Sequence, residues 1–191
     1  GVTVLPQNEK EARKAFKLAK KKNLSSTKAD VLGERYYAGD NYRLLVLGDK
    51  VIAAALRKHA CVVGDGETTI QNLIDHKNKK RKERMLKQIK IDRKLKSTIK
   101  KSGYSLNSVP KKDEEVKLSF SSNQTAGGTT EECLDIVHDD YKKMAVRATR
   151  AIGLKLGGVD LITPKIGEPV KGAVINEINY NPGLRIHYKP S

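Results

Sequence analysis

Residues 172–183 read GAVINEINYNPG, an apolar run that ends in a Glu-x-Asn pair and is followed at once by a turn. If residues 173–179 form a strand, the two-residue period of its side chains places Glu177 and Asn179 on one face. A carboxylate and an amide oxygen that point the same way suit a hard cation such as Mg²⁺. Taken alone, the pair is better explained as the polar end of a strand that meets solvent.

A second apolar segment favours the cation site. Residues 156–163 read LGGVDLIT and place Asp160 among residues that favour β-structure, in the segment that precedes the Glu-x-Asn strand. Two neighbouring strands that each carry a metal-type ligand are harder to explain as ordinary strand ends. The two segments together therefore predict a metal site formed by Asp160, Glu177 and Asn179.

The size and composition of the chain set the class of protein. Its 191 residues suffice for one domain of ordinary size or for two small lobes that share an aliphatic core, since Trp is absent. No apolar run approaches the ~20 residues that span a bilayer, and the first residues, GVTVLP, do not resemble a signal peptide. Cys61 and Cys133 do not imply a disulfide framework, so a cytoplasmic location is expected. Because the chain begins without Met, we expect a fragment of a longer protein.

The net charge of +16, from 38 Lys and Arg against 22 Asp and Glu, favours an anionic partner: nucleic acid, an anionic membrane or a phosphorylated small molecule. Much of the excess lies between Lys77 and Lys101, where apolar residues recur at close to helical spacing. This pattern favours a helix with one apolar and one solvated basic face over a dedicated nucleic-acid helix. Aromatic residues, which stack bases, do not interleave with the basic run, so nucleic acid is the less favoured partner.

Helical and strand patterns predict an α+β fold without a regular βαβ alternation. The expected helices are residues 9–22 capped by Asn8, a helix opened by residues 67–69, the basic helix between 77 and 101, and residues 138–152. The expected strands are residues 1–6, 42–47, 51–56, 116–120, 156–163 and 173–179, with a hairpin at Gly48-Asp49-Lys50. Residues 102–113 and 121–130 are expected to be loops.

Several other polar residues stand where they could meet a ligand. Glu34 lies in an apolar segment, where it would either pair with a lysine or accept hydrogen bonds from a ligand. Arg43 and Arg57 flank the hairpin, and each could fork onto a phosphate or carboxylate or simply be a surface arginine. His187 is as compatible with a structural role as with a catalytic one. Nucleophile signatures such as Gly-x-Ser-x-Gly are absent, so any chemistry would rest on positioning and charge stabilisation.

In this order along the chain, the motifs resemble those of the ATP-grasp ligases. They are ERYYAGDNYR at 34–43, VVGDG at 62–66, NQTAGG at 123–128, GVD at 158–160 and EINYNPGLRIH at 177–187. Within that superfamily the chain is most similar to the ATP-grasp domain of cyanophycin synthetases, and next to the bifunctional glutamate–cysteine ligase/glutathione synthetases. The resemblance implies an ATP-grasp fold of two α+β lobes with ATP between them. Residues 1–39 would be part of the small lobe and 40–191 the large lobe, with the N-terminal lobe missing.

The resemblance also implies a role for each group of residues. One or two Mg²⁺ ions, or Mn²⁺, would be held by Asp160, Glu177 and Asn179. The contacts to ATP would be made by Gly1 at the phosphates, Glu34 and Tyr37 at the adenine, and Asn41 at the ribose. The phosphoryl group or acyl-phosphate would be steadied by Arg57 and Arg185. The substrate would be enclosed by Arg43 and by the loop residues Asn123, Thr125, Gly127 and Gly128.

The implied reaction joins a carboxylate to an amine at the cost of ATP. The carboxylate attacks the γ-phosphate to give an acyl-phosphate and ADP, and the amine then displaces phosphate to form an amide. Phosphoryl transfer mainly needs metals and cations placed on developing charge, which agrees with the missing nucleophile. The implied partners are ATP, amino-acid or peptide substrates and further copies of the chain in a homo-oligomer, without a membrane.

Three alternatives stay open: a glutathione-synthetase-like ligase, a basic nucleic-acid-binding module without catalysis, and an ATP-grasp fold retained for protein interaction. The chain also departs from the family. The lysine that precedes the glycine-rich loop is absent, Gly33 replaces a β-branched residue, and the segment around residues 78–87 is short. We therefore do not expect the chain alone to be fully active.

Overall fold

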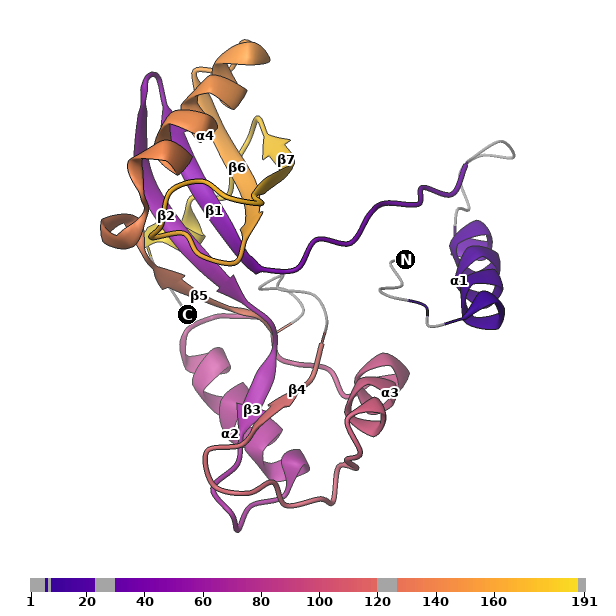
Figure 1. Cartoon of the computed structure of the whole chain (residues 1–191). Coiled ribbons are helices and arrows are strands. Elements are labelled where there is room, and N and C mark those ends of the chain that lie inside the picture. The colour runs from indigo at the N-terminus through magenta and orange to yellow at the C-terminus, as the bar shows by residue number, and fades with distance from the viewer. Residues whose placement is uncertain (1–5, 7, 23–29, 120–126, 189–191) are drawn as a thin grey trace. The chain divides into compact units, whose positions relative to one another are not determined.

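In the computed structural model of the chain, residues 6, 8–22, 30–119 and 127–188 are described. The chain divides into two units, residues 1–37 and 38–191, and the elements of each are shown in Figure 1. The predicted strand at residues 1–6 lies, apart from Pro6, outside the described residues. In the part of the chain that the structure describes, none of the helices is long and apolar enough to cross a membrane.

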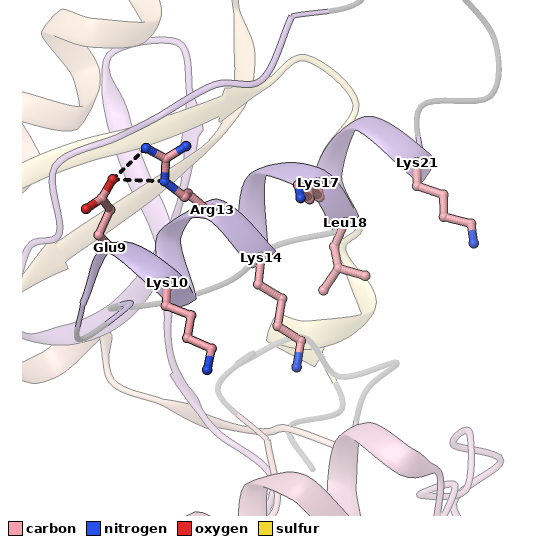
Figure 2. A pocket seen from close by; sticks show the side chains of 7 residues that line it. All are labelled: Glu9, Lys10, Arg13, Lys14, Lys17, Leu18 and Lys21. Carbon is pink, nitrogen blue, oxygen red and sulfur yellow. Dashed lines mark hydrogen bonds and ion pairs between the residues drawn. The ribbon is translucent and has the colours of Figure 1, made fainter.

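Helix α1 (Glu9–Lys22) lies in the first unit and confirms the predicted helix. It begins at Asn8, whose side-chain oxygen accepts a hydrogen bond from the backbone N–H of Glu11 at 2.9 Å. Glu9 and Glu11 lie in the first turn, where a negative charge interacts favourably with the helix dipole. Glu9 also pairs with Arg13 at 2.6 Å, as the dashed lines in Figure 2 show.

A five-stranded antiparallel sheet forms the centre of the second unit, with the strand order β5-β2-β1-β6-β7. Its strands are β1 (Asp40–Leu47), β2 (Lys50–Lys58), β5 (Thr129–Glu132), β6 (Leu156–Thr163) and β7 (Val174–Asn179). The predicted hairpin joins β1 to β2 through Gly48-Asp49, and Gly48 adopts the positive φ of 61° that such a tight turn requires. The strands predicted at 42–47, 51–56, 156–163 and 173–179 are thus confirmed.

Helix α4 (Asp139–Ala151) covers one face of this sheet (Figure 1). The sheet contributes alternate residues of β1 and β6 to the core under α4, among them Leu44 and Val159, and the helix contributes Tyr141 and Ala145. The hydroxyl groups of Tyr141 and Thr163 are hydrogen-bonded at 2.8 Å across this contact. Because side chains alternate along a strand, the residues between these core positions point to the opposite face of the sheet.

A smaller group of elements has a core of its own and lies apart from α4 in Figure 1. It consists of the two-stranded sheet of β3 (Cys61–Val63) and β4 (Glu115–Lys117) with α2 (Ile70–Glu83) and α3 (Arg93–Lys101). Helix α2 begins after residues 67–69, as predicted, and Thr69 caps it by accepting a hydrogen bond from the N–H of Asn72; Asp92 caps α3 in the same way. Two short helices, η2 (Leu134–Ile136) and α5 (Arg185–Tyr188), complete the unit.

The prediction of one basic helix between residues 77 and 101 is wrong. Helix α2 ends at Glu83, Met85 has a positive φ of 55°, and α3 starts only at Arg93. The side chain of Asn78 holds the connection by accepting from the N–H of Ile89 and donating to its C=O. Ile89 and the α3 residues enter the same core, so their apolar spacing reflects shared burial and not one continuous helix.

The boundaries of one predicted loop and one predicted strand also differ from the sequence prediction. The predicted loop at 121–130 ends earlier, because Thr129 and Thr130 pair with Lys58 and Arg57 of β2 as the start of β5. The predicted strand at 116–120 is confined to β4, which extends from Glu115 to Lys117.

One basic residue of α2 is part of the protein interior. Arg81 is only 4% exposed, and its guanidinium donates to the backbone carbonyls of Lys87 at 2.8 Å and of Gly127 and Gly128 at 3.3 Å each. These bonds join the end of α2 to the residues that lead into β5. Burial lowers the pKa of Arg81 from its ordinary value.

We expect Arg81→Met to destabilise the protein by about 2–4 kcal/mol, because it leaves buried carbonyl groups without their charged donor. Urea unfolding measures the difference. Lys82→Met is the matched control, since its side chain is exposed one residue further along α2 and its loss should change stability by less than about 0.5 kcal/mol. Equal effects of the two substitutions would contradict the role given to Arg81.

Candidate metal and anion site on the open face of the sheet

A row of charged residues crosses the face of the sheet opposite α4. Arg43 of β1 lies directly opposite Asp160 of β6, and Asp160 in turn lies opposite Glu177 of β7. Arg57 of β2 lies on the same face, because it follows by two residues Ala55, the partner of Arg43. Glu132 of β5, the other partner of Ala55, lies on this face as well. The sheet therefore gathers two arginines and three carboxylates from five strands onto one surface, which we call the open face.

Asp160 is the centre of this row and is only 9% exposed. Arg43 forks onto it: Nε donates to Oδ1, and Nη2 donates to Oδ2 at 2.8 Å. Arg57 donates from Nη1 to the same Oδ2 at 2.9 Å. One carboxylate thus carries two guanidinium partners, an arrangement that compensates for its removal from water.

Gly158 makes room for the Arg43 side chain. A Cβ atom at Gly158 would lie 3.1 Å from Cδ and Nη1 of Arg43 and 2.7 Å from Cβ of the buried Pro182. Pro182 and Arg43 therefore occupy the space that a larger side chain at residue 158 would fill. Gly158 of the Gly-x-Asp motif and Pro182 of the Asn-Pro-Gly motif thus belong to the same close contact.

Glu177 and Asn179 lie on the open face as their spacing predicts, but β7 is not regular. A β-bulge between the pairs Asp160–Glu177 and Leu161–Ile175 leaves Asn176 as an extra residue. Ile175 and Ile178 consequently both pack against the core under α4, while Glu177 faces the other way. The two-residue period assumed for residues 173–179 holds from Glu177 onward and fails before it.

The donor set on β6 and β7 fits a hard divalent cation. Asp160 and Glu177 are register partners and Asn179 lies one side-chain repeat away, so two carboxylates and an amide oxygen share one face. The Nδ2 atom of Asn179 is buried without a hydrogen-bond partner among the described residues. Among the residues that the structure describes, no group of three or more His, Cys, Asp or Glu could hold a metal ion. The amide of Asn179 is therefore needed as the third ligand beside Asp160 and Glu177.

His187 of α5 is a further polar group that belongs to the surroundings of Arg43. Both ring nitrogens are buried and have no hydrogen-bond partner in the described part of the chain. Burial lowers the pKa of His187 and the charge of Arg43 lowers it further, whereas Glu132 acts in the opposite direction. The imidazole is therefore favoured in its neutral form.

The structure separates Arg185 from this row. Its Nη2 atom donates to the carbonyl of Arg84 at 2.9 Å and that of Met85 at 3.5 Å, at the end of α2. Asn41, the predicted ribose contact, lies on the open face opposite Arg57. The role of Arg185 at the phosphoryl group and that of Asn41 at the ribose both stay predictions.

The remaining predicted residues are placed as follows. In the first unit, Glu34 and Tyr37 are exposed, and the guanidinium of Arg35 lies 5.4 Å from the ring centre of Tyr37. Gly127 and Gly128 are buried, and their carbonyls accept from Arg81. Gly1, Asn123 and Thr125 lie outside the described residues.

A hollow along α1 is chemically different from the open face. Figure 2 shows the side chains that line it, which all come from the one helix: Glu9, Lys10, Arg13, Lys14, Lys17, Leu18 and Lys21. Most of them are lysines that extend away from the helix, and no second element contributes. The hollow along α1 therefore lacks the adjacent strands that bring opposite charges together at Asp160.

Sequence reasoning missed the burial of Arg81 and the contact between Gly158, Arg43 and Pro182. Arg81 stands within a run of lysines and arginines, and charge patterning alone does not distinguish the one that is buried. The two glycines at 157–158 within an apolar run were the available signal for a close approach on β6.

The antiparallel sheet with one face covered by α4 agrees with the α+β architecture that the sequence motifs predict. The family model for the RimK-like ATP-grasp domain matches residues 70–190. The chain therefore belongs to the RimK-like ATP-grasp family, and the fold predicted from the sequence motifs is confirmed.

Curated relatives agree with this assignment. Cyanophycin synthetase from Crocosphaera subtropica is 36% identical over 198 residues, covering 100% of this chain and 22% of the relative. The glutathione biosynthesis bifunctional protein GshAB of Clostridium perfringens is 32% identical over 199 residues, covering 100% of this chain and 25% of that protein. The chain thus spans about a quarter or less of the length of these relatives.

A solved structure extends the likeness to three dimensions. The crystal structure of a bifunctional glutathione synthetase from Pasteurella multocida matches with a TM-score of 0.70 and 35% identity. The match covers 81% of this chain and 22% of that protein.

The close contact at residue 158 predicts that Gly158→Ala destabilises the protein by about 1–3 kcal/mol, because the added methyl group displaces Arg43 or Pro182. Gly183→Ala is the matched control, since a Cβ there meets nothing within 4 Å and its effect should stay below about 0.5 kcal/mol. Chemical denaturation measures both, and a Gly158→Ala protein as stable as the control would disprove the contact.

A pH dependence follows from His187. Its pKa in the folded chain lies below its ordinary value of 6.5, so the unfolded chain binds the proton more readily and acidification favours unfolding. We expect the stability of the unmodified chain to decrease below about pH 6.5 and His187→Asn to remove part of that decrease. Urea unfolding across this range tests it, with His76→Asn, an exposed histidine of α2, as the control that should retain the full decrease.

Proposed function

We propose that the chain is the nucleotide- and metal-binding part of an ATP-dependent carboxylate–amine ligase that forms an amide through an acyl-phosphate. The observation that carries the proposal is the open face, where Asp160 lies between two arginines and opposite Glu177 on a sheet of the ATP-grasp family. Both kinds of curated relative bear the names of enzymes of biosynthesis: cyanophycin synthetase and a glutathione biosynthesis protein. Their names support a substrate that is an amino acid or a peptide.

Asp160, Glu177 and Asn179 would hold Mg²⁺ or Mn²⁺ together with the phosphates of ATP. A bound divalent cation supplies charge neutralisation and orientation at the transferred phosphoryl group. Asp160 and Glu177 provide the oxygens from adjacent strands, in register, so the spacing of the two carboxylates is set by the sheet and not by a loop.

Arg57 would supply the positive charge that the reaction needs at the phosphoryl group or acyl-phosphate, while Arg43, the proposed substrate contact, adds its charge from beside Asp160. The fork of a guanidinium matches phosphate oxygens and carries its charge at any physiological pH. Their position beside Asp160 brings this charge to the place where the phosphoryl group is held. Charge stabilisation of this kind requires no nucleophilic side chain.

The other roles follow the family resemblance. Gly1, Glu34, Tyr37 and Asn41 would contact ATP, with residues 1–39 in the small lobe and 40–191 in the large one. Arg185 would act on the phosphoryl group after leaving the carbonyls of Arg84 and Met85, and residues 123–128 would enclose the substrate. A cyanophycin-synthetase-like amino-acid or peptide substrate is proposed first, since those relatives have the higher identity, and a glutathione-synthetase-like substrate second.

Calorimetric titration of the chain with Mn²⁺ and ATP tests the proposal. We expect binding of the nucleotide to require the cation, and Glu177→Ala to weaken it at least tenfold, equivalent to about 1.4 kcal/mol. Glu131→Gln is the control, because Glu131 is an exposed carboxylate that pairs with Lys58 away from the open face. Absence of binding, or equal binding by the Glu177→Ala protein, would refute the metal site. Binding to DNA that weakens steeply with salt would favour the nucleic-acid alternative instead.

A further inference from the structure

The carboxylate of Asp160 has two uses that exclude each other in part. In the structure both of its oxygens accept hydrogen bonds from arginines, and Oδ2 accepts from two of them. The proposed function, on which this inference rests, assigns the same oxygens to a divalent cation. A cation and a guanidinium cannot occupy the same side of one oxygen, so binding of the cation must alter the arginine contacts.

The two arginines differ in how firmly they are held. Arg43 makes two bonds to Asp160 from the neighbouring strand, and its side chain lies against the Gly158–Pro182 contact. Arg57 makes a single bond to Asp160 and reaches it across β1 from β2. Its side chain is 19% exposed against 11% for Arg43. Arg57 is therefore the arginine that can leave at the lower cost.

We propose that Arg57 exchanges partners: it neutralises Asp160 until a divalent cation binds there, and it then turns its guanidinium to the phosphate chain of the ligand. Arg43 stays with Asp160 throughout and keeps the carboxylate in place. The cation and the phosphate chain consequently bind cooperatively, because the first frees the group that binds the second.

The charges on the open face support this coupling. Before a ligand binds, the two arginines are hydrogen-bonded to Asp160 and share the open face with two further carboxylates, Glu177 and Glu132. A divalent cation alone would leave an excess of positive charge in a partly buried site, which is unfavourable. A cation that arrives with a polyphosphate brings the compensating anion, and the released Arg57 adds a hydrogen-bond donor to it. Linkage requires that each ligand raise the affinity for the other by the same factor.

Electron paramagnetic resonance of Mn²⁺ measures the affinity for the cation directly, without reference to enzymatic activity. The chain is titrated with Mn²⁺ alone and at saturating tripolyphosphate, as the unmodified protein and as Arg57→Gln. For the unmodified chain we expect weak binding of Mn²⁺ alone and an affinity about tenfold higher with tripolyphosphate, after allowing for Mn²⁺ bound to free tripolyphosphate.

Arg57→Gln should raise the affinity for Mn²⁺ alone and reduce the gain in affinity that tripolyphosphate causes. Without its competitor at Asp160, Mn²⁺ alone should bind about two- to fivefold more tightly, as expected for loss of one partly exposed ion pair. The increase caused by tripolyphosphate should shrink towards twofold or less, since the transferable donor is gone. A purely structural arginine would weaken both kinds of binding together and would not produce this pattern.

Lys58→Gln is the matched control for net charge. It removes one positive charge from the adjacent residue, whose side chain pairs with Glu131 away from the open face. It should leave both affinities within about twofold of the unmodified chain, because an exposed charge of this kind is well screened by salt. Arg57→Lys keeps the charge without the fork, so it should give intermediate coupling, and it replaces Arg57→Gln if that protein does not fold.

The outcomes separate this inference from the proposed function. Mn²⁺ affinity and coupling that are the same with and without Arg57 would overturn the exchange of partners and leave the metal site intact. Tighter binding of Mn²⁺ alone in both Arg57→Gln and Lys58→Gln would also overturn it, in favour of net charge. Failure of Mn²⁺ to bind any variant, with or without tripolyphosphate, would overturn the proposed function and this inference with it.

Discussion

The ion pair between Arg43 of β1 and Asp160 of β6 is the interaction on which the sheet and its open face depend. It requires β1 and β6 to pair in one register, because a slip of one residue would turn one of the two charges towards the apolar core under α4 and separate it from its partner. Breaking such a pair leaves a buried charge without compensation, which is costly. The pair therefore specifies the register that also places Glu177 and Arg57 beside Asp160.

The sheet is divided into an apolar face and a charged face, so one small unit combines a packed core with a surface of positioned charges. Under α4 the strands contribute aliphatic and tyrosine side chains, and stability rests on their burial. On the other face, guanidinium and carboxylate groups pair with one another in place of apolar contacts. A site built in this way supplies positioned charge and not a reactive side chain, which is what phosphoryl transfer requires.

Much of the local structure was predictable because local signals determine it. Asn8, Thr69 and the Gly48-Asp49 turn fix element boundaries within a few residues of themselves, and the sequence revealed each of them. The partners of Asp160 were not predictable, since nothing local links residue 160 to residues 43 and 57. The break of the basic helix at Met85 was hidden for the same reason: distant packing of Ile89 and α3 overrides a helical spacing. The metal ligands themselves stay a prediction.

The bulge at Asn176 has a consequence for the edge of the sheet. In the sheet as described, β7 is the outer strand, and a regular outer strand with free backbone groups is a template for pairing with another chain. The extra residue interrupts the repeat of those groups, and Glu177 places a charge beside the interruption. The irregularity beside Glu177 thus also makes this outer strand a poorer template for edge-to-edge pairing.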